Sequence, residues 1–190
     1  MCRFMSTEYE NRRVKMTKKL LRDALLAILE HKSIDQITIK ELCEKADLNR
    51  STFYLHYSCP LDVLKEMESQ VISDSVERLE KVTPDLDSID TIATFLEYIK
   101  ENENVFSALL CQNGQDVFRK RFISECLSHY SDAIIFDMED EKRQYVYQFL
   151  VNGSLAVLQS WIANDFRPDA RSIAEMVYNL SDNAIKAYKA

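Results

Sequence analysis

Glycine and proline are scarce in this sequence, and that scarcity limits the folds open to it. Only two glycines and three prolines occur among 190 residues. Hairpins and phosphate-cradling loops depend on tight turns, which these residue types favour. Hydrophobic residues make up 46% of the chain, enough to bury a core. We therefore predict an all-α fold, and apolar residues that recur at helical spacing predict about nine helices.

Charge divides the chain into a basic beginning and an acidic remainder. Residues 1–57 carry eleven Lys and Arg against eight Asp and Glu, a net charge of +3, whereas residues 58–190 carry a net charge of −10. An acidic body repels nucleic acid, so this division is expected where only one end of a protein meets a polyanion. We predict two domains, residues 1–58 and residues 59–190.

Cysteine and histidine are too dispersed in the sequence to indicate a metal site. The five cysteines lack the close pairing of zinc sites and small disulfide frameworks, and we expect free thiols. We find no G-x-S-x-G, Gly-rich phosphate loop or H-E-x-x-H pattern, and therefore predict no catalytic residue, cofactor or metal. No apolar stretch suits a signal peptide or a membrane span, so we expect a cytoplasmic protein without membrane contact.

Three helical segments stand close together near the amino terminus. The first, over residues 17–30, has a basic start and an apolar face made of Leu21, Ala24, Leu25, Ile28 and Leu29. A capping box of Thr38 and Glu41 begins the second, with the hydroxyl accepting from the Glu41 amide and the carboxylate reaching back to the Thr38 amide. Asp47 interrupts this helix, and Asn49 offers a second N-cap. Two short helices joined by a tight turn predict a helix-turn-helix.

The second short helix, Asn49 to Tyr57, would lie in the major groove of DNA. Leu48, Phe53 and Tyr57 are its expected inward anchors. Arg50 can contact guanine through two hydrogen bonds, and Thr52 can meet a thymine methyl or a base edge. Hydroxyl and imidazole groups can bind phosphate, as can the exposed start of the preceding helix. The predicted DNA-contacting residues are Thr38, Lys40, Asn49, Arg50, Ser51, Thr52, Tyr54, His56 and Tyr57.

The segment ITIKELCEKADLNRSTFYLHY, Ile37 to Tyr57, resembles the DNA-binding core of TetR-type regulators. This resemblance implies a homodimer on a palindromic double-stranded operator and a small-molecule effector in the carboxy-terminal domain. Two positions depart from the family pattern. Asp47 replaces a frequent glycine, which is tolerable because Asp enters the left-handed region more readily than most residues. Pro60 replaces a lysine that the family usually presents to phosphate, so that contact should be absent.

The carboxy-terminal domain offers candidates for an effector pocket and for a dimer interface. Aromatic residues could line a largely apolar pocket, although core packing explains most of them equally well: Phe95, Tyr98, Phe106, Phe118, Phe122, Tyr145, Phe149 and Trp161. Small and apolar residues of the last two helices could form a four-helix interface with a second copy: Gly153, Ala156, Val157, Ile173, Val177, Leu180 and Ala184. The segment from Asn152 to Pro168 also resembles Gram-positive regulators related to dihydroxyacetone kinase operons.

We therefore predict a dimeric DNA-binding regulator, with repression as the expected sign of its action. A helix over residues 61–82 would couple effector binding to the spacing of the two reading helices. Three alternatives stay open: a regulator without an effector, a protein-interaction adaptor on the same fold, and a small helical enzyme. Pro60 and the acidic body favour the adaptor, whereas no motif in the sequence supports the enzyme.

Overall fold

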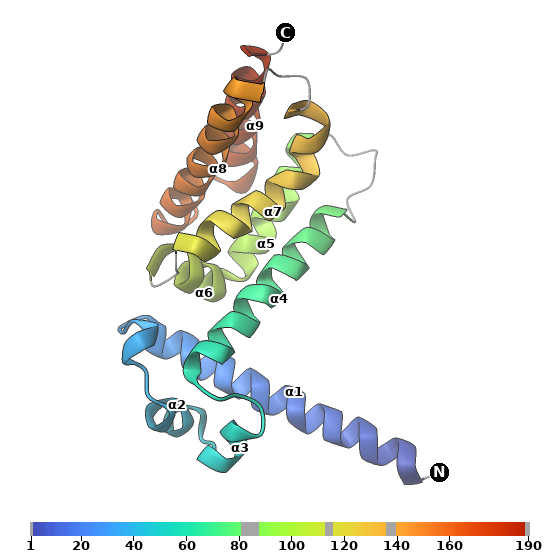
Figure 1. The fold of residues 1–190 in the computed structure, drawn as a ribbon, viewed down its shortest axis with the longest axis vertical. Helices are drawn as coiled ribbons and strands as arrows, with labels where there is room; N and C mark the ends of the chain where they lie inside the picture. Colours follow the sequence, from blue (N-terminus) through green and yellow to red (C-terminus); the bar gives the residue numbers. More distant parts are fainter. Residues whose placement is uncertain (1, 81–87, 113–115, 136–139, 189–190) are drawn as a thin grey trace. The chain divides into compact units, whose positions relative to one another are not determined.

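The computed structural model describes residues 2–80, 88–112, 116–135 and 140–188, and within these ranges it contains helices and no strands. This confirms the all-α prediction (Figure 1). The α-helices are α1 (Cys2–Leu29), α2 (Ile39–Ala46), α3 (Arg50–Tyr54), α4 (Pro60–Glu80), α5 (Ser88–Glu101), α6 (Glu103–Phe106), α7 (Asp116–Ile135), α8 (Asp140–Ala163) and α9 (Ala170–Lys186). A 3₁₀ turn, Ile34–Gln36, precedes α2, and a π-helical turn, Ser107–Gln112, follows α6.

Helix α1 is longer than the sequence pattern predicted. The expected start near Thr17 is wrong, because the helix runs without interruption from Cys2. Residues 2–16 contain neither glycine nor proline, so nothing in this segment opposes the continuation of a helix towards the amino terminus. None of the helices in the described ranges is long and apolar enough to cross a membrane.

The chain divides into two compact units, Met1–Ser69 and Gln70–Ala190. The first unit therefore includes the beginning of α4, beyond the boundary that we expected at Ser58. Three apolar side chains explain this extension, since Val63, Leu64 and Met67 of α4 are buried. Helix α4 contributes residues to both units.

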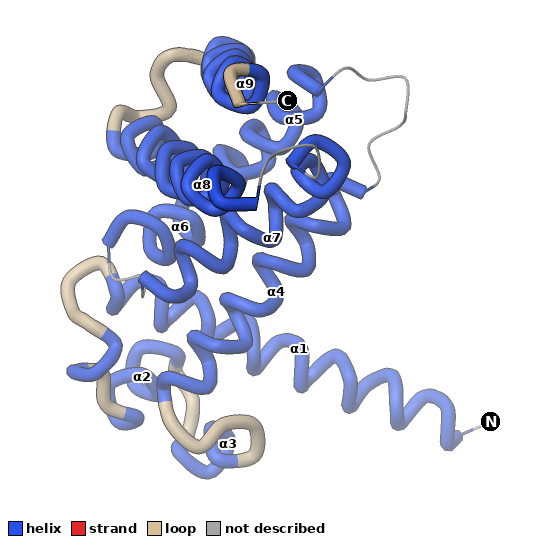
Figure 2. The backbone as a smooth tube through the Cα atoms, turned by 45° about the horizontal axis from the view of Figure 1, so that its top comes forward, coloured by secondary structure: helices blue, strands red, loops and turns tan. Residues whose placement is uncertain are grey.

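The core of the first unit is made of the apolar faces of its short helices and of α1. Leu21, Leu25 and Leu29 of α1 are at most 1% exposed, and α2 packs against this helix. Phe53 is the fully buried aromatic residue of α3. Figure 2 shows the amino-terminal half of α1 extending beyond α2 and α3. These contacts hold the turn between α2 and α3 in place.

The second unit is built from the later helices. Helix α9 packs along α5, and α7 packs along α8. Ser124 of α7 and the hydroxyl of Tyr147 in α8 share a short hydrogen bond. Between the π-helical turn and α8, the Gln159 side chain donates a hydrogen bond to the Leu110 carbonyl at 2.6 Å. These two hydrogen bonds fix α8 against α7 and against the π-helical turn.

Candidate nucleic-acid interface

Helix α2 begins where the sequence predicted it would. Thr38 is its N-cap, and the Glu41 amide donates a hydrogen bond to the Thr38 hydroxyl at 3.2 Å. The second half of the predicted capping box was wrong. The Glu41 carboxylate accepts instead from Lys32 Nζ, at 2.6 Å. This ion pair ties the start of α2 to the segment that directly follows α1.

The turn between α2 and α3 has the geometry of a Schellman motif. Asp47 adopts φ 53° and ψ 46°, in the left-handed region that its sequence position predicted. The Leu48 amide donates to the Cys43 carbonyl at 2.9 Å, and the Asp47 amide donates to the Glu44 carbonyl at 3.3 Å. These two hydrogen bonds satisfy carbonyls at the end of α2 and fix the direction in which α3 begins.

Replacing Asp47 by glycine is expected to stabilise the protein by about 0.5–1 kcal/mol, because glycine occupies the left-handed region without the clash that a Cβ causes. Thermal unfolding followed by circular dichroism should show a transition a few degrees higher. Asp47→Val is the matched control and should lower the transition, since a β-branched residue is strongly disfavoured at positive φ. A lower transition for the glycine variant would show that the Asp47 side chain stabilises the turn.

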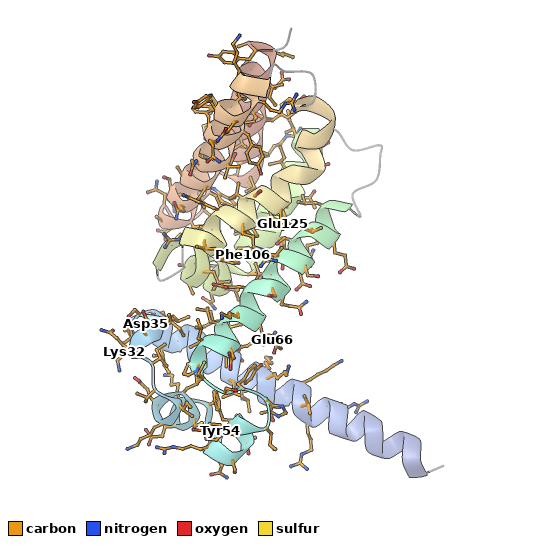
Figure 3. The ribbon with its side chains drawn as sticks, in the orientation of Figure 1. Lys32, Asp35, Tyr54, Glu66, Phe106 and Glu125 are labelled. Atoms are coloured by element: carbon orange, nitrogen blue, oxygen red, sulfur yellow. The ribbon has the colours of Figure 1, made fainter. Side chains whose placement is uncertain are left out.

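Helix α3 is short, and its polar side chains are those that the sequence proposed for DNA. Asn49 occupies the N-cap position without a side-chain hydrogen bond to the helix amides. Arg50, Ser51 and Tyr54 are exposed, and Thr52 is partly exposed. Figure 3 shows Tyr54 on α3, where its side chain is 60% exposed. On α2, Thr38 and Lys40 are exposed as well, although Lys40 also lies 3.8 Å from Glu44.

The last residues of the predicted reading helix separate into exposed and buried ones. The helix itself ends at Tyr54, so residues 55–57 form a turn. Leu55 is 78% exposed, and sequence reasoning did not include it, because an apolar residue between polar ones resembles a core position. His56 is partly exposed. Tyr57 is only 6% exposed and packs beside Phe53, which places it with the inward anchors rather than with the exposed row.

An ion pair between α1 and α4 lies beside Tyr57. Lys18 Nζ donates to both carboxylate oxygens of Glu66, at 3.0 and 2.9 Å, and lies 5.5 Å from the centre of the Tyr57 ring. Burial alone would raise the pKa of Glu66, but the hydrogen bond from Lys18 and the positive charges of Lys18 and Arg22 hold it below its ordinary value. Burial, followed by the Glu66 charge, raises the pKa of the Tyr57 hydroxyl. Glu66 therefore stays a carboxylate that joins α4 to α1 (Figure 3).

Helix α4 begins with a cap that the sequence did not reveal. Pro60 takes the first helical position, as predicted, and is buried. The amides of Ser58 and Cys59 donate to Asp62 Oδ2 at 2.8 and 3.1 Å. These two bonds lower the pKa of Asp62. A carboxylate three residues into the helix thus compensates for Cys59, whose side chain is a poor cap.

Five of the eight residues predicted for an effector pocket form one aromatic cluster in the second unit. Tyr98 packs edge-on to Phe106 at 5.6 Å between ring centres, and Phe122 lies 6.3, 5.8 and 6.0 Å from Phe95, Phe106 and Phe118. Arg78 of α4 lies 4.0 Å from the centre of the Tyr98 ring. Burial and the nearby Asp74 charge raise the pKa of Tyr98, and Arg78 opposes them. The cluster is therefore bordered by charged groups of α4.

The three other predicted pocket residues lie outside this cluster. Tyr145 and Phe149 are 77% and 63% exposed, because they lie on the face of α8 away from the buried Val146 and Leu150. Trp161 is buried at the end of α8, where its indole nitrogen donates to the Pro168 carbonyl at 2.6 Å. Its ring contacts Phe166 edge-on. These positions could not be distinguished in the sequence, since all three lie on helical apolar patterns.

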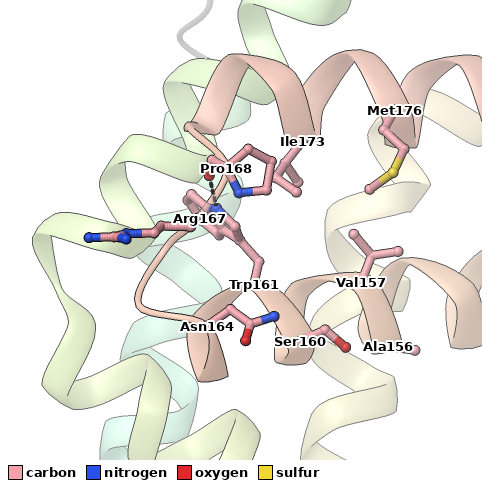
Figure 4. Close-up of a pocket in the computed structure, with 9 residues that line it drawn as sticks. All are labelled: Ala156, Val157, Ser160, Trp161, Asn164, Arg167, Pro168, Ile173 and Met176. Atoms are coloured by element: carbon pink, nitrogen blue, oxygen red, sulfur yellow. Dashed lines mark hydrogen bonds between the residues drawn. The ribbon is translucent and has the colours of Figure 1, made fainter.

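An open hollow of about 320 Å³ lies between the end of α8 and the start of α9 (Figure 4). Apolar and polar side chains share its lining, among them Val157, Ser160, Trp161, Asn164, Ile173 and Met176. A smaller hollow of about 70 Å³ lies beside Gly153, also between the two helices. Both open along the helices for which the sequence predicted a dimer interface.

The predicted interface residues differ in their exposure. Ile173 is buried within its own unit, whereas Gly153, Val157, Val177 and Ala184 are partly exposed. Ala156 is exposed, and the Leu180 side chain is 56% exposed. A Cβ added at Gly153 would meet no atom within 4 Å, so the chain's own packing does not require a glycine there. Within the described part of the chain, α8 and α9 therefore keep apolar side chains such as Phe149 and Leu180 largely exposed.

Comparison with known proteins gives results for both parts of the chain. A TetR-type family model, described as a transcriptional regulator C-terminal region, matches residues 87–183. The HTH-type transcriptional regulator YxbF of Bacillus subtilis (strain 168) is 25% identical over 176 residues, which is 84% of this chain. The chain spans 43% of the length of that relative.

Solved structures with a similar fold include two bacterial regulators. A TetR transcriptional regulator from Streptococcus agalactiae 2603V superposes with a TM-score of 0.68, at 22% identity, over 92% of this chain and 98% of the other. The dihydroxyacetone kinase operon activator DhaS superposes with a TM-score of 0.54, at 14% identity, over the same shares of the two chains. Both likenesses concern the fold, which extends through nearly the whole length of the molecule.

Proposed function

Because this chain belongs to the TetR family of transcriptional regulators, we propose that it is a homodimeric repressor of the cytoplasm. Each subunit would place α3 in the major groove of one half of a palindromic operator. A small molecule bound in the second unit would weaken this binding. We infer repression from steric exclusion at a promoter. The fold does not determine the sign of regulation, because DhaS shares the fold and is an activator.

The observation that carries the DNA-binding proposal is the row of exposed polar side chains on α3. Arg50, Ser51 and Tyr54 stand on a helix whose start is fixed by the Asp47 turn and whose inner side is anchored by Phe53. This arrangement leaves a guanidinium, a hydroxyl and a phenol exposed on the helix. Such groups are the donors that read base edges and phosphates.

Dimerisation is supported by the exposed apolar side chains of α8 and α9. Phe149, Met176 and Leu180 are large and accessible, and two hollows adjoin them. A second copy packed on these helices would form a four-helix interface and bury these residues. It would also hold two α3 helices about 34 Å apart, the spacing that half-sites one helical turn apart require.

The aromatic cluster around Phe122 is our proposed effector region. It combines stacked apolar rings with the phenol of Tyr98 and the charges of Arg78 and Asp74 at its border. An effector that binds between these rings would act on α4, which carries Arg78 and also belongs to the DNA-binding unit. A change in α4 would alter the separation of the two reading helices.

Selection of bound duplexes from a random DNA library tests the proposal directly. We expect the purified chain, at a fixed moderate salt concentration, to enrich a palindrome whose half-sites are centred about ten base pairs apart. The selected duplex should bind two copies of the chain in sedimentation. An absence of enrichment at both low and moderate salt would contradict the DNA-binding proposal and favour the adaptor.

A further inference from the structure

Helix α1 carries a basic segment that the proposed reading of DNA by α3 does not use. Six Lys and Arg and no Asp or Glu occur between Arg12 and Arg22. One of the six, Lys18, is committed to Glu66 of α4. Lys15 and Lys19 are exposed, and among the described residues neither forms an ion pair. Their charges are therefore available to a partner.

Helical spacing gathers these cations into one row. Arg12, Lys15, Lys19 and Arg22 follow one another at intervals of three, four and three residues, which places them on a single face of a helix. We call these four residues the basic stripe. It lies away from the buried face of α1 that carries Leu21 and Leu25. With a rise of about 1.5 Å per residue, the stripe is about 15 Å long.

The stripe lies close to the carboxyl end of α3. Lys18, which is adjacent to Lys19 in the sequence, lies 5.5 Å from the centre of the Tyr57 ring, and Tyr57 belongs to the short segment that follows Tyr54, the last residue of α3. The Arg22 charge also acts on Tyr57. The amino-terminal half of α1 extends beyond α2 and α3, the short helices of the same unit (Figure 2). The basic stripe of α1 therefore extends outwards from the residues that follow α3.

Folding gives no reason for cations at these positions. Lys15 and Lys19 lie several turns from either end of α1, where the helix dipole neither favours nor opposes a cation. The chain as a whole has a net charge of −7, which makes an uninterrupted basic segment a local exception. A polyanionic partner accounts for this local concentration of cations, and the neighbouring α3 indicates which polyanion it is.

We propose that the basic stripe of α1 binds the phosphate backbone of the DNA that flanks each half-site. This inference rests on the proposed function, since it assumes that α3 lies in the adjacent major groove. It adds a second contact surface that reads no bases and increases affinity for all sequences alike. It also extends the bound DNA beyond the palindrome that α3 recognises.

The test compares the wild-type chain with Lys15→Gln/Lys19→Gln on the selected operator. Fluorescence anisotropy would measure affinity over a series of salt concentrations, on duplexes that end at the palindrome and on duplexes extended by about one turn at each side. If the stripe binds phosphates, the plot of log affinity against log salt should be less steep for the double variant. The magnitude of its slope should fall by about 3–4, or about 0.9 for each of the four lysines removed from the dimer. The stripe also predicts that only the wild type gains affinity from the extension.

A matched control removes the same charge elsewhere. Lys100→Gln/Lys120→Gln changes two exposed lysines of α5 and α7 in the second unit and should behave as the wild type does. An unchanged slope and an unchanged gain from flanking DNA in the α1 variant would overturn the inference and leave the proposed function standing. A wild-type chain that bound no duplex would overturn both.

Discussion

Replacing Arg50 by alanine is expected to lower affinity for the selected operator by at least about tenfold and to relax the preference at one base pair of each half-site. A bidentate contact between arginine and guanine contributes about 1–3 kcal/mol of discrimination, and the dimer would lose two of them. Arg50 is exposed on α3, so the thermal unfolding transition should stay where it is. Anisotropy with the operator, with single-base variants and with unrelated duplexes measures both effects.

Lys45→Ala is the control for this experiment. Lys45 is an exposed cation at the end of α2, outside the row that α3 presents. Its removal should weaken binding to all duplexes slightly and leave the base preference unchanged. If Arg50→Ala instead weakened every duplex equally, Arg50 would be a phosphate contact and base recognition would have to come from other side chains.

Introducing a charge at Leu180 is expected to separate the dimer into folded monomers. Leu180 is 56% exposed on α9, so aspartate there should not disturb the unit to which it belongs. In a dimer interface the same carboxylate would be buried without a partner, at a cost of several kcal/mol. Sedimentation velocity should show the monomer, and operator affinity should fall about a hundredfold or more, since two linked half-site contacts become one.

Asn179→Asp provides the matched charge on the same helix. Asn179 is exposed on α9 but lies off the apolar row of Val177, Leu180 and Ala184. That variant should remain dimeric and bind its operator normally. A Leu180→Asp chain that stayed dimeric would show that the two copies meet through another surface, and the positions of Phe149 and Met176 would then need a different explanation.

The short helices of the first unit could be predicted from the sequence because their signals are local. A threonine cap, a residue able to adopt positive φ and a buried phenylalanine each act within a few positions of the chain, and the structure has Thr38, Asp47 and Phe53 in these roles. The start of α1 could not be predicted in this way. The sequence of its first turns contains no glycine or proline that would mark a boundary, and the apolar period appears only from Leu21 onwards.

The choice of hydrogen-bond partners and the packing between helices were the other source of error. The Glu41 carboxylate bonds Lys32 from the preceding connection, and Asp62 caps a helix whose predicted N-cap was a poor one. The exposure of Tyr145 and Phe149 likewise depends on which side of α8 faces α7. Residue type and spacing indicate that a helix is amphipathic, but the packing of the other helices decides which of its aromatic side chains are covered.

The ring-to-ring packing around Phe122 has a consequence for how such a protein would respond to a small molecule. The rings of the cluster pack against one another, so a guest that enters between them must displace contacts that help to keep the second unit folded. Part of the guest's intrinsic affinity is then spent on opening the site. The effector concentration at which the regulator responds would accordingly depend on how strongly these phenylalanines pack against one another, as well as on the contacts that they make with the guest.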